Sequence, residues 1–295
     1  MELFSAKFKA MGSPCALFLY AETASAISVA ENKVIEMLDG WEMKYSRYQS
    51  DSALSQINQQ AGTSARFRLD DEFWQLVQYA NTAYEISDGL FDITSGVLRE
   101  VWHRNTQEIP SQQTIEACLK RIGWDKVAMQ KKNFHLPLPG MQIDLGGIVK
   151  EFAADAIANQ LLNMGYTSGL IDLGGDITVL GAKPSGEPWN IAISHPQAPE
   201  SAIATIPMIS GGLASSGDYQ RFIEIDGERY CHIVNPKTGW PTKGLAGVSV
   251  FTEQCVVAGT LSTIAMLKGA EGLSWLRQLG CQFVAIDESM KVHTS

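Results

Sequence analysis

The segment DLGGIVKEFAADAIANQLLNMGYTSGLIDLGGDITVL, residues 144–180, contains the strongest fold signals in the chain. Its tetrapeptide Asp-Leu-Gly-Gly occurs twice, at 144–147 and 172–175, and each copy follows an apolar, strand-like run. Apolar residues then recur with helical spacing over 148–163, so the first copy leads directly into a predicted helix. The N-terminus of that helix would present backbone N–H groups and a positive partial charge to a phosphate. Tight turns that end strands without binding a ligand explain the glycine pairs equally well.

The remaining patterns predict helices first and mostly strands afterwards. Helical spacing predicts helices over 24–41, from an N-cap at Asp70 to a stop near 87–89, and from Ser111 to Gly123. Strand-like segments lie at 15–21, 168–180, 189–194, 203–209, 219–226, 229–234, 246–252 and 281–286, with further helices at 254–268 and 271–279. Consecutive strands predict antiparallel or mixed sheets with helices packed outside, an α+β fold in a single domain spanning 1–295. Without regular βαβ alternation or a G-x-G-x-x-G motif, a doubly wound dinucleotide-binding fold is disfavoured.

The charge balance narrows the range of partners. The 295 residues include 23 Lys plus Arg and 32 Asp plus Glu, a formal net charge of −9. Such an acidic chain is a poor general binder of nucleic acid or of an anionic membrane, because both require a concentrated basic face. No apolar run approaches the ~20 residues of a membrane-spanning helix, so no transmembrane segment is predicted. A small anionic ligand held by local groups or by a metal remains compatible with this charge.

Cysteine usage and the N-terminus bear on the compartment. The five cysteines form no C-x-x-C pair and no zinc-ligand spacing, so we expect buried free thiols in a reducing environment. Lys7 and Lys9 precede the apolar run at 15–21, which superficially resembles a secretory signal, but the run is short and no small-residue cleavage site follows it. We interpret the run as a strand and expect the chain as given to be cytoplasmic, or periplasmic if a signal has been removed.

His232 is the candidate catalytic side chain. It lies at the end of a strand-like run, just before the turn sequence Asn-Pro-Lys-Thr-Gly at 235–239. A histidine at the end of a strand is often structural, whereas turns that redirect the chain frequently position functional groups. From this segment alone both interpretations stay open.

Seven short motifs occur in a fixed order along the chain. They lie at 11–13, 45–58, 87–96, 144–155, 173–176, 216–219 and 232–239. This succession closely resembles the ApbE family, the FAD:protein FMN transferases, and the resemblance extends from about residue 8 to about residue 285. It implies an α+β fold in which FAD lies in a cleft between separated parts of one chain.

The resemblance also implies roles for individual residues. Met11 and Tyr48 would lie against the flavin, where an aromatic face can stack on the ring system. Leu90, Phe91 and Asp92 would line the cofactor through backbone contacts and the Asp92 carboxylate. Asp144 and Lys150 flank the glycine turn, and Lys150 would bring positive charge to the pyrophosphate.

Family members transfer the FMN half of FAD to a threonine hydroxyl of a target flavoprotein and release AMP. Such a phosphoryl-type transfer requires alignment of the hydroxyl and stabilisation of charge on the phosphate oxygens, which a divalent cation, usually Mg²⁺, supplies. His232 matches the family histidine and would orient or deprotonate the incoming threonine.

The metal motif departs from the family pattern at one position. Near the C-terminus, members carry Ala-Asp-Ala-x-Ser/Asp-Thr, whose Asp and Thr are four residues apart on one helix face and hold the cation. The matching stretch here is AGTLST at 258–263, in which Thr263 is retained and Gly259 replaces the Asp. The resemblance leaves Thr263 and a carbonyl near Gly147 as metal ligands. Two smaller departures are Asn235 in place of Asp and Glu151 in place of Gly.

Three explanations fit Gly259. Phosphate oxygens and waters complete the metal's shell, or a carboxylate from elsewhere, such as Glu151 or Glu253, reaches the site, or the metal binds weakly. The main functional hypothesis is a Mg²⁺-assisted FAD:protein FMN transferase. The alternatives are an FAD-binding protein with weakened or lost transfer and a slow FAD hydrolase that yields FMN and AMP. We expect Gly259→Asp to increase magnesium dependence and transfer if the site is otherwise intact.

Overall fold

The computed structural model describes residues 1–103, 105–217 and 222–295. Within these residues the main sheet has eight strands, and every neighbouring pair is antiparallel. In spatial order these are β1 (Glu2–Ala10), β2 (Ser13–Ala21), β6 (Gly169–Leu173), β7 (Ile177–Gly181), β10 (Gly211–Gly217), β13 (Leu245–Thr252), β14 (Gln282–Asp287) and β15 (Val292–Thr294). Some neighbouring strands, such as β2 and β6 or β7 and β10, are far apart in the sequence, so the sheet brings remote motifs together.

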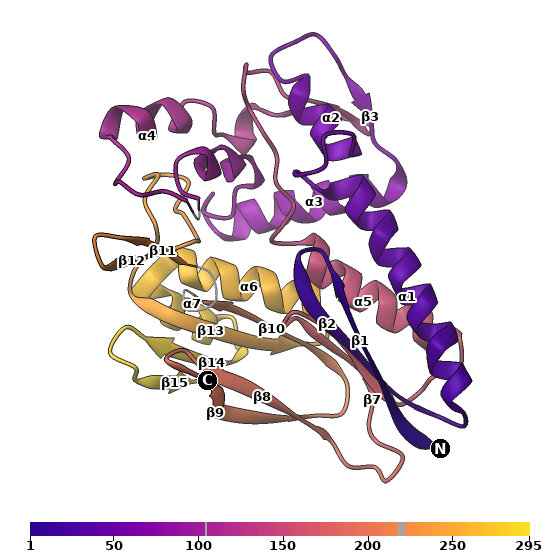
Figure 1. The fold of residues 1–295 in the computed structure, drawn as a ribbon. Helices are drawn as coiled ribbons and strands as arrows, with labels where there is room; N and C mark the ends of the chain where they lie inside the picture. Colours follow the sequence, from indigo (N-terminus) through magenta and orange to yellow (C-terminus); the bar gives the residue numbers. More distant parts are fainter. Residues whose placement is uncertain (104, 218–221) are drawn as a thin grey trace.

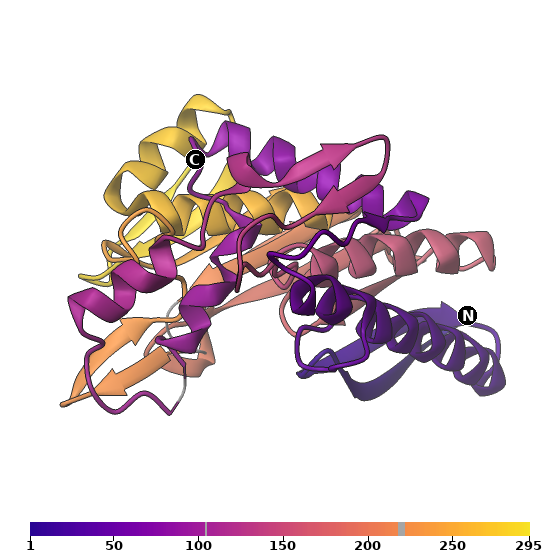
Figure 2. The same cartoon turned by 90° about the horizontal axis from the view of Figure 1, so that it is seen from above.

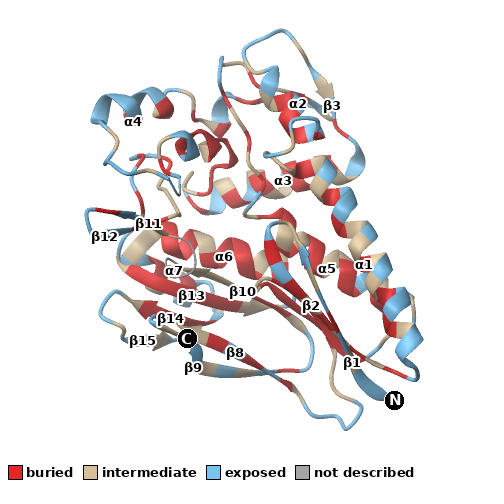
Figure 3. Ribbon diagram, in the orientation of Figure 1, coloured by how far each residue is buried: buried red, intermediate tan, exposed pale blue. Residues whose placement is uncertain are grey.

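Three helices cover one face of this sheet (Figures 1 and 2). They are α1 (Ala24–Tyr45), which packs on β1 and β2, α5 (Val149–Asn163), which packs on β6 and β7, and α6 (Cys255–Lys268), which packs on β10 and β13. Helices α5 and α6 also contact each other directly. Burial of apolar side chains between the sheet and these helices forms the main core, shown as the concentration of buried residues in Figure 3.

The opposite face of the sheet is covered by a hairpin of β8 (Trp189–His195) and β9 (Ala198–Met208). Successive side chains of a strand point to opposite faces, so Leu170 of β6 packs in the cluster with Trp189 whereas Ile171 belongs to the main core. Both faces of the central strands are therefore buried.

A further layer lies beyond the helices, at the top of Figure 1. It contains α2 (Ala53–Gln59), α3 (Asp71–Ile86), α4 (Gln112–Leu119), a small sheet of β3 (Phe67–Arg68), β4 (Ala128–Gln130) and β5 (Asn133–His135), and the 3-10 turns Ile93–Glu100 and Trp124–Lys126. Beside it lies the ribbon β11 (Phe222–Ile225) and β12 (Glu228–Cys231), while α7 (Gly272–Gln278) follows α6 after the turn Gly269–Glu271. Tyr79 of α3 joins this layer to α6, because its hydroxyl lies 2.9 Å from the Thr260 hydroxyl.

The α+β expectation is confirmed, with antiparallel pairing throughout the described sheets. Asp70 caps α3 as predicted, accepting a hydrogen bond of 2.8 Å from the Phe73 amide. Among the described residues no helix is both long and apolar enough to cross a bilayer. All five cysteines are free.

Several element predictions were wrong in detail. The expected strand at 168–180 is two strands, because Gly174 and Gly175 both adopt positive φ and turn the chain back. Neither β10 nor the edge strand β1 was expected. Most β1 side chains are exposed or only half-buried, which leaves little apolar alternation to detect. Of the strand expected at 219–226, residues 219–221 lie outside the described part of the chain.

Candidate active site

Segments that are far apart in the sequence line one large cavity of about 1130 Å³. Its walls come from the β1–β2 turn, the end of α1, the segment before α5, the β6–β7 turn, the end of β10, the segment after β12 and the face of α6. This volume exceeds that of most small-ligand pockets, so a large cofactor can enter. All ten residues assigned a binding, catalytic or metal role from the sequence line it: Met11, Tyr48, Leu90, Phe91, Asp92, Asp144, Gly147, Lys150, His232 and Thr263.

The charged side chains that line the cavity are mostly acidic. Among the described residues, four basic side chains line it, namely Lys7, Arg47, Arg99 and Lys150, against six acidic ones, namely Glu42, Asp92, Asp144, Glu151, Asp172 and Asp176. A pyrophosphate entering this cavity would therefore meet an excess of carboxylates. A cation that bridges carboxylate and phosphate would remove that repulsion.

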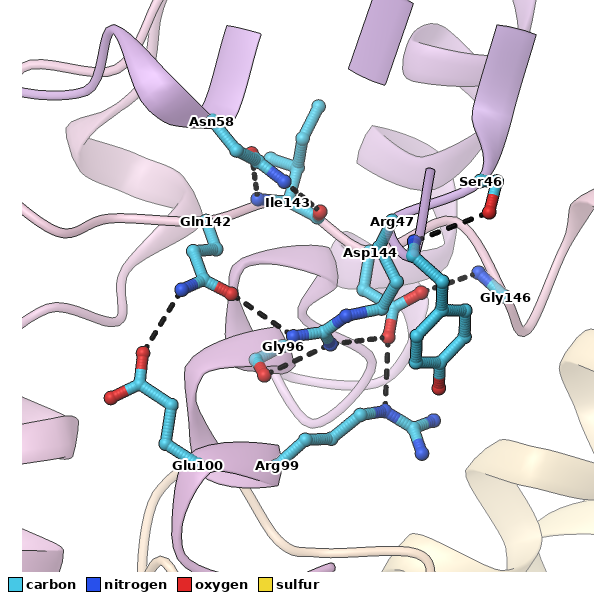
Figure 4. A network of polar contacts seen from close by, with 11 residues as sticks. Ser46, Arg47, Asn58, Gly96, Arg99, Glu100, Gln142, Ile143, Asp144 and Gly146 are labelled. Atoms are coloured by element: carbon cyan, nitrogen blue, oxygen red, sulfur yellow. Dashed lines mark hydrogen bonds and ion pairs between the residues drawn. The ribbon is translucent and has the colours of Figure 1, made fainter. Parts of the chain in front are cut away.

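Two arginines hold Asp144 at the first Asp-Leu-Gly-Gly turn (Figure 4). Its Oδ2 lies 2.9 Å from Arg47 Nη1 and 3.0 Å from Arg99 Nε, and its Oδ1 accepts a hydrogen bond of 2.8 Å from the Gly146 amide. Burial alone would raise the pKa of Asp144, but the charges of Arg99 and Arg47 outweigh it and lower that pKa. The carboxylate is therefore ionised and fixed, and it shapes the turn that leads into α5.

The neighbouring residues keep this turn in place (Figure 4). The Asn58 side chain makes two hydrogen bonds with the Ile143 backbone, of 2.9 and 2.8 Å, and Arg47 Nη2 donates to Gln142 Oε1 at 3.0 Å. Gln142 in turn donates to Glu100 at 2.9 Å. Sequence reasoning gave no role to Arg47, Asn58 or Arg99. Arg47 and Asn58 lie inside the motif at 45–58, whereas Arg99 lies outside all seven motifs.

Met11 occupies the tight turn between β1 and β2, with a φ of 48°. Together with Gly12 at 70°, it forms a two-residue hairpin loop in which both residues are left-handed. The Met11 amide donates to Glu42 Oε2 of α1 at 3.1 Å, which ties the turn to the cavity wall. Such a conformation is costly for a non-glycine residue and is typical of functional positions. Tyr48 lines the same cavity and is 83% exposed.

The Leu90-Phe91-Asp92 wall is fixed by its own hydrogen bonds. The Asp92 carboxylate accepts from the Thr94 amide at 2.7 Å, from the Thr94 hydroxyl at 2.6 Å and from the Trp124 amide at 3.1 Å. The Phe91 amide donates to Ser87 Oγ at 2.8 Å. The Asp92 carboxylate is thus engaged within the protein, and its principal observed effect is to shape the wall.

Lys150, in the first turn of α5, faces the second Asp-Leu-Gly-Gly copy. Its Nζ lies 2.5 Å from Asp176 Oδ2, and Asp172 Oδ1 accepts a hydrogen bond of 2.7 Å from the Gly175 amide in the β6–β7 turn. Burial raises the pKa of Asp176, which the Lys150 ammonium only partly offsets, and burial raises the pKa of Asp172 as well. The positive charge of Lys150 is therefore shared with carboxylates rather than directed wholly at the cavity.

Helix α6 brings hydroxyl groups to the wall. Thr263 Oγ1 lies 3.0 Å from Ser216 Oγ at the end of β10, and Ser216 Oγ lies 2.8 Å from Ser262 Oγ. His232 approaches from the segment after β12 and lines the same cavity. Asp218 and Tyr219 of the 216–219 motif lie outside the described residues.

Helix α6 is held at its N-terminus by Asp155 of α5. The carboxylate accepts hydrogen bonds from the Cys255 amide at 2.9 Å, the Val256 amide at 3.0 Å and the Thr178 hydroxyl at 3.0 Å. Gln254, which precedes the helix, provides no side-chain cap. Asp155 therefore fixes α6, and with it position 263, relative to α5.

The Glu151 side chain lies directly over Gly259. A Cβ atom added at Gly259 would lie 2.6 Å from Glu151 Cγ and 2.8 Å from its Oε1. Glu151 is 7% exposed, and burial, reinforced by the neighbouring Asp176 carboxyl, raises its pKa well above the usual range. Glu253 is exposed and is absent from the described cavity lining. The expectation for Gly259→Asp needs correction, because a side chain at 259 would have to displace Glu151.

Comparison with known proteins assigns this architecture to a family. The sequence model of the ApbE family matches residues 11–285. This chain belongs to the ApbE family.

Individual ApbE relatives match most of the chain. The FAD:protein FMN transferase of Haemophilus influenzae is 31% identical over 239 residues, which make up 77% of this chain and 69% of the relative. The protein of the same name from Treponema pallidum is 31% identical over 281 residues, 88% of this chain and 77% of the relative. The crystal structure of the ApbE protein from Thermotoga maritima has a TM-score of 0.92 at 27% identity, covering 100% of this chain and 97% of that one.

The donor set of this ApbE chain limits how a metal can be held. Among the described residues, no group of three or more His, Cys, Asp or Glu side chains is arranged to bind a metal ion. A hard cation in this cavity would therefore depend on mixed oxygen donors, such as hydroxyls, backbone carbonyls and phosphates, together with single carboxylates. The cavity lining includes one protein donor of each kind: the Thr263 hydroxyl, the Gly147 backbone carbonyl and the Glu151 carboxylate.

Proposed function

We propose that this chain is an FAD:protein FMN transferase. It would transfer FMN from FAD to the hydroxyl of a threonine in a target flavoprotein and release AMP. The observation that carries the proposal is the convergence of all seven ApbE motifs on one cavity large enough for a dinucleotide. Residues 1–295 would act as one transferase domain, and the free cysteines agree with a cytoplasmic location.

The chain's own residues would bind and orient the flavin. Met11, Leu90 and Phe91 give an apolar wall for the ring system, and the exposed Tyr48 offers an aromatic face that can close over it. Asp144, held by Arg47 and Arg99, and Asp92, held by Thr94, fix the backbone against which the cofactor would lie. Lys150, at the N-terminus of α5, would bring a positive charge and the helix end to the pyrophosphate.

The transfer step would form one phosphoester bond, between threonine and FMN, and break one phosphoanhydride bond, between FMN and AMP. The threonine oxygen would attack the phosphorus on the FMN side of the pyrophosphate, the bond to the AMP oxygen would break, and the threonine proton would pass to His232. His232 follows β12 directly and lines the cavity, so it could approach a hydroxyl that enters the cavity.

The residues at the α5–α6 end of the cavity fit a divalent cation. The acidic surplus, the Thr263 hydroxyl and the Gly147 backbone provide the hard oxygen donors that Mg²⁺ prefers. We propose that Thr263 and the Gly147 carbonyl hold it. When bound, it would neutralise negative charge on the phosphate oxygens.

The direct test uses FAD, Mg²⁺ and a flavoprotein domain with an acceptor threonine. We expect covalent, fluorescent flavin on the target with the unmodified chain, and none with His232→Ala, while flavin fluorescence titration shows that His232→Ala still binds FAD. Bound FAD without labelled target at saturating Mg²⁺ would instead support a flavin-binding protein. Release of FMN and AMP without any acceptor would support a hydrolase.

A further inference from the structure

Position 259 is the place where the family motif has its metal-binding carboxylate and this chain has none. The structure shows that the space is nevertheless filled. Glu151 Cγ, Cδ and Oε1 all lie within 2.9 Å of where a Cβ atom at 259 would be, so a carboxylate from α5 overlies the α6 position. Position 151 is also the one at which the chain has Glu where the family pattern has Gly.

The Glu151 carboxylate has an unused oxygen in a buried place. Glu151 is 7% exposed. Its Oε2 is inaccessible to solvent and has no hydrogen-bond partner among the described residues. An unpartnered buried carboxylate oxygen is costly, because water has been removed and nothing replaces it. The same residue lines the cavity together with Thr263 and Gly147. An oxygen-binding ligand at this point would supply the missing partner.

We infer that Glu151 provides the carboxylate ligand of the divalent cation, in place of the Asp that the family motif has at position 259. The carboxylate thus enters from α5 instead of α6 and joins the Thr263 hydroxyl and the Gly147 carbonyl. This inference rests on the proposed function for the identity of the site. It distinguishes between the explanations for Gly259, because Glu253 is exposed and lies away from the described lining.

The assignment makes Glu151 and Gly259 a reciprocal pair. The glutamate occupies the space beside Gly259, and the distances there mean that a side chain at 259 requires the Glu151 side chain to move. Moving the carboxylate back to α6 therefore requires two changes, Glu151→Gly and Gly259→Asp together.

The test measures metal binding directly and needs no acceptor protein. The full chain is titrated with Mn²⁺, with and without saturating FAD, and the free Mn²⁺ signal is followed by electron paramagnetic resonance. We expect Glu151→Gln to raise the Kd for Mn²⁺ by about tenfold or more, since even groups behind the ligands typically change metal affinity by that factor. The matched control is Glu253→Gln, which removes an exposed carboxylate just before α6. This variant should bind Mn²⁺ with the same Kd as the unmodified chain.

The double variant Glu151→Gly with Gly259→Asp should return the Kd to within about threefold of the unmodified chain, because it restores one carboxylate to the same space. Unchanged Mn²⁺ binding in Glu151→Gln overturns the inference, as does an unmodified chain that binds no Mn²⁺ at millimolar concentration. If circular dichroism shows that Glu151→Gln does not fold, the double variant decides, and a folded double variant without Mn²⁺ affinity also overturns the inference. A chain that transfers no FMN but shows Glu151-dependent Mn²⁺ binding would refute the proposed function and leave the ligand assignment intact.

Discussion

Replacing Asp155 by Ala should loosen the helix that carries one wall of the cavity. The change removes three hydrogen bonds at once, two to the first amides of α6 and one to the Thr178 hydroxyl. Loss of a helix cap costs about 0.5–2 kcal/mol, and loss of the third hydrogen bond costs about 1 kcal/mol. Burial raises the pKa of Asp155, because removing the carboxylate from water has a cost. That cost offsets part of the stability that the three hydrogen bonds contribute. We expect a net loss of about 2 kcal/mol of unfolding free energy.

The assay is urea unfolding of Asp155→Ala and of two companions, followed by circular dichroism. Asp155→Asn keeps one acceptor oxygen without the charge and should lose roughly half as much. Asp39→Ala removes an exposed carboxylate from α1 and should leave the unfolding midpoint unchanged. A free energy of unfolding for Asp155→Ala within about 0.5 kcal/mol of the unmodified chain, the usual range for surface substitutions, would refute the capping argument.

Two further predictions concern Asp144 and Met11. The Arg99 and Arg47 charges outweigh burial and place the folded-state pKa of Asp144 below its unfolded value, which is about 3.9. The contribution of Asp144 to the stability of the fold is therefore complete above that unfolded value and is lost as the pH falls through the folded-state pKa. Acid titration of stability should therefore show a steeper fall below about pH 4 for the unmodified chain than for Asp144→Asn, and parallel curves would contradict the assignment. Met11→Asn places a residue that tolerates left-handed backbone before Gly12 and should raise the unfolding free energy by about 0.5–1 kcal/mol. It should also weaken FAD binding in a flavin fluorescence titration, and unchanged affinity would argue against contact between Met11 and the flavin.

Local signals predicted the elements whose chemistry lies within a few residues. The cap at Asp70 fixes the start of α3, and the apolar spacing over 148–163 gives α5 almost to the residue. Strand β1 was not predicted because this edge strand buries few side chains. Strand β10 was not predicted because its glycines and serines are typical of a loop. Their pairing partners lie far away in the sequence, and only the assembled sheet shows why these segments are extended.

The site residues likewise include some that the sequence predicted and some that it did not. Motif residues could be assigned to one cavity from their order along the chain, because the family resemblance carries the tertiary arrangement with it. The support of Asp144 by Arg99 could not be predicted, since that arginine lies in no motif and the ion pair spans 45 positions. The contact between the Glu151 side chain and Gly259 depends on how α5 packs against α6, and local sequence patterns do not predict that packing.

Because the Glu151 side chain fills the space beside Gly259, the effect of a substitution at either position depends on the residue at the other. A side chain that appears first at 259 collides with Glu151, and a glutamate that is lost first leaves a hole between α5 and α6. Each single step is therefore penalised, although the two steps together restore both the volume and the charge. The pair is an instance of epistasis, and relatives with a small residue at 151 should be those that carry a carboxylate at 259.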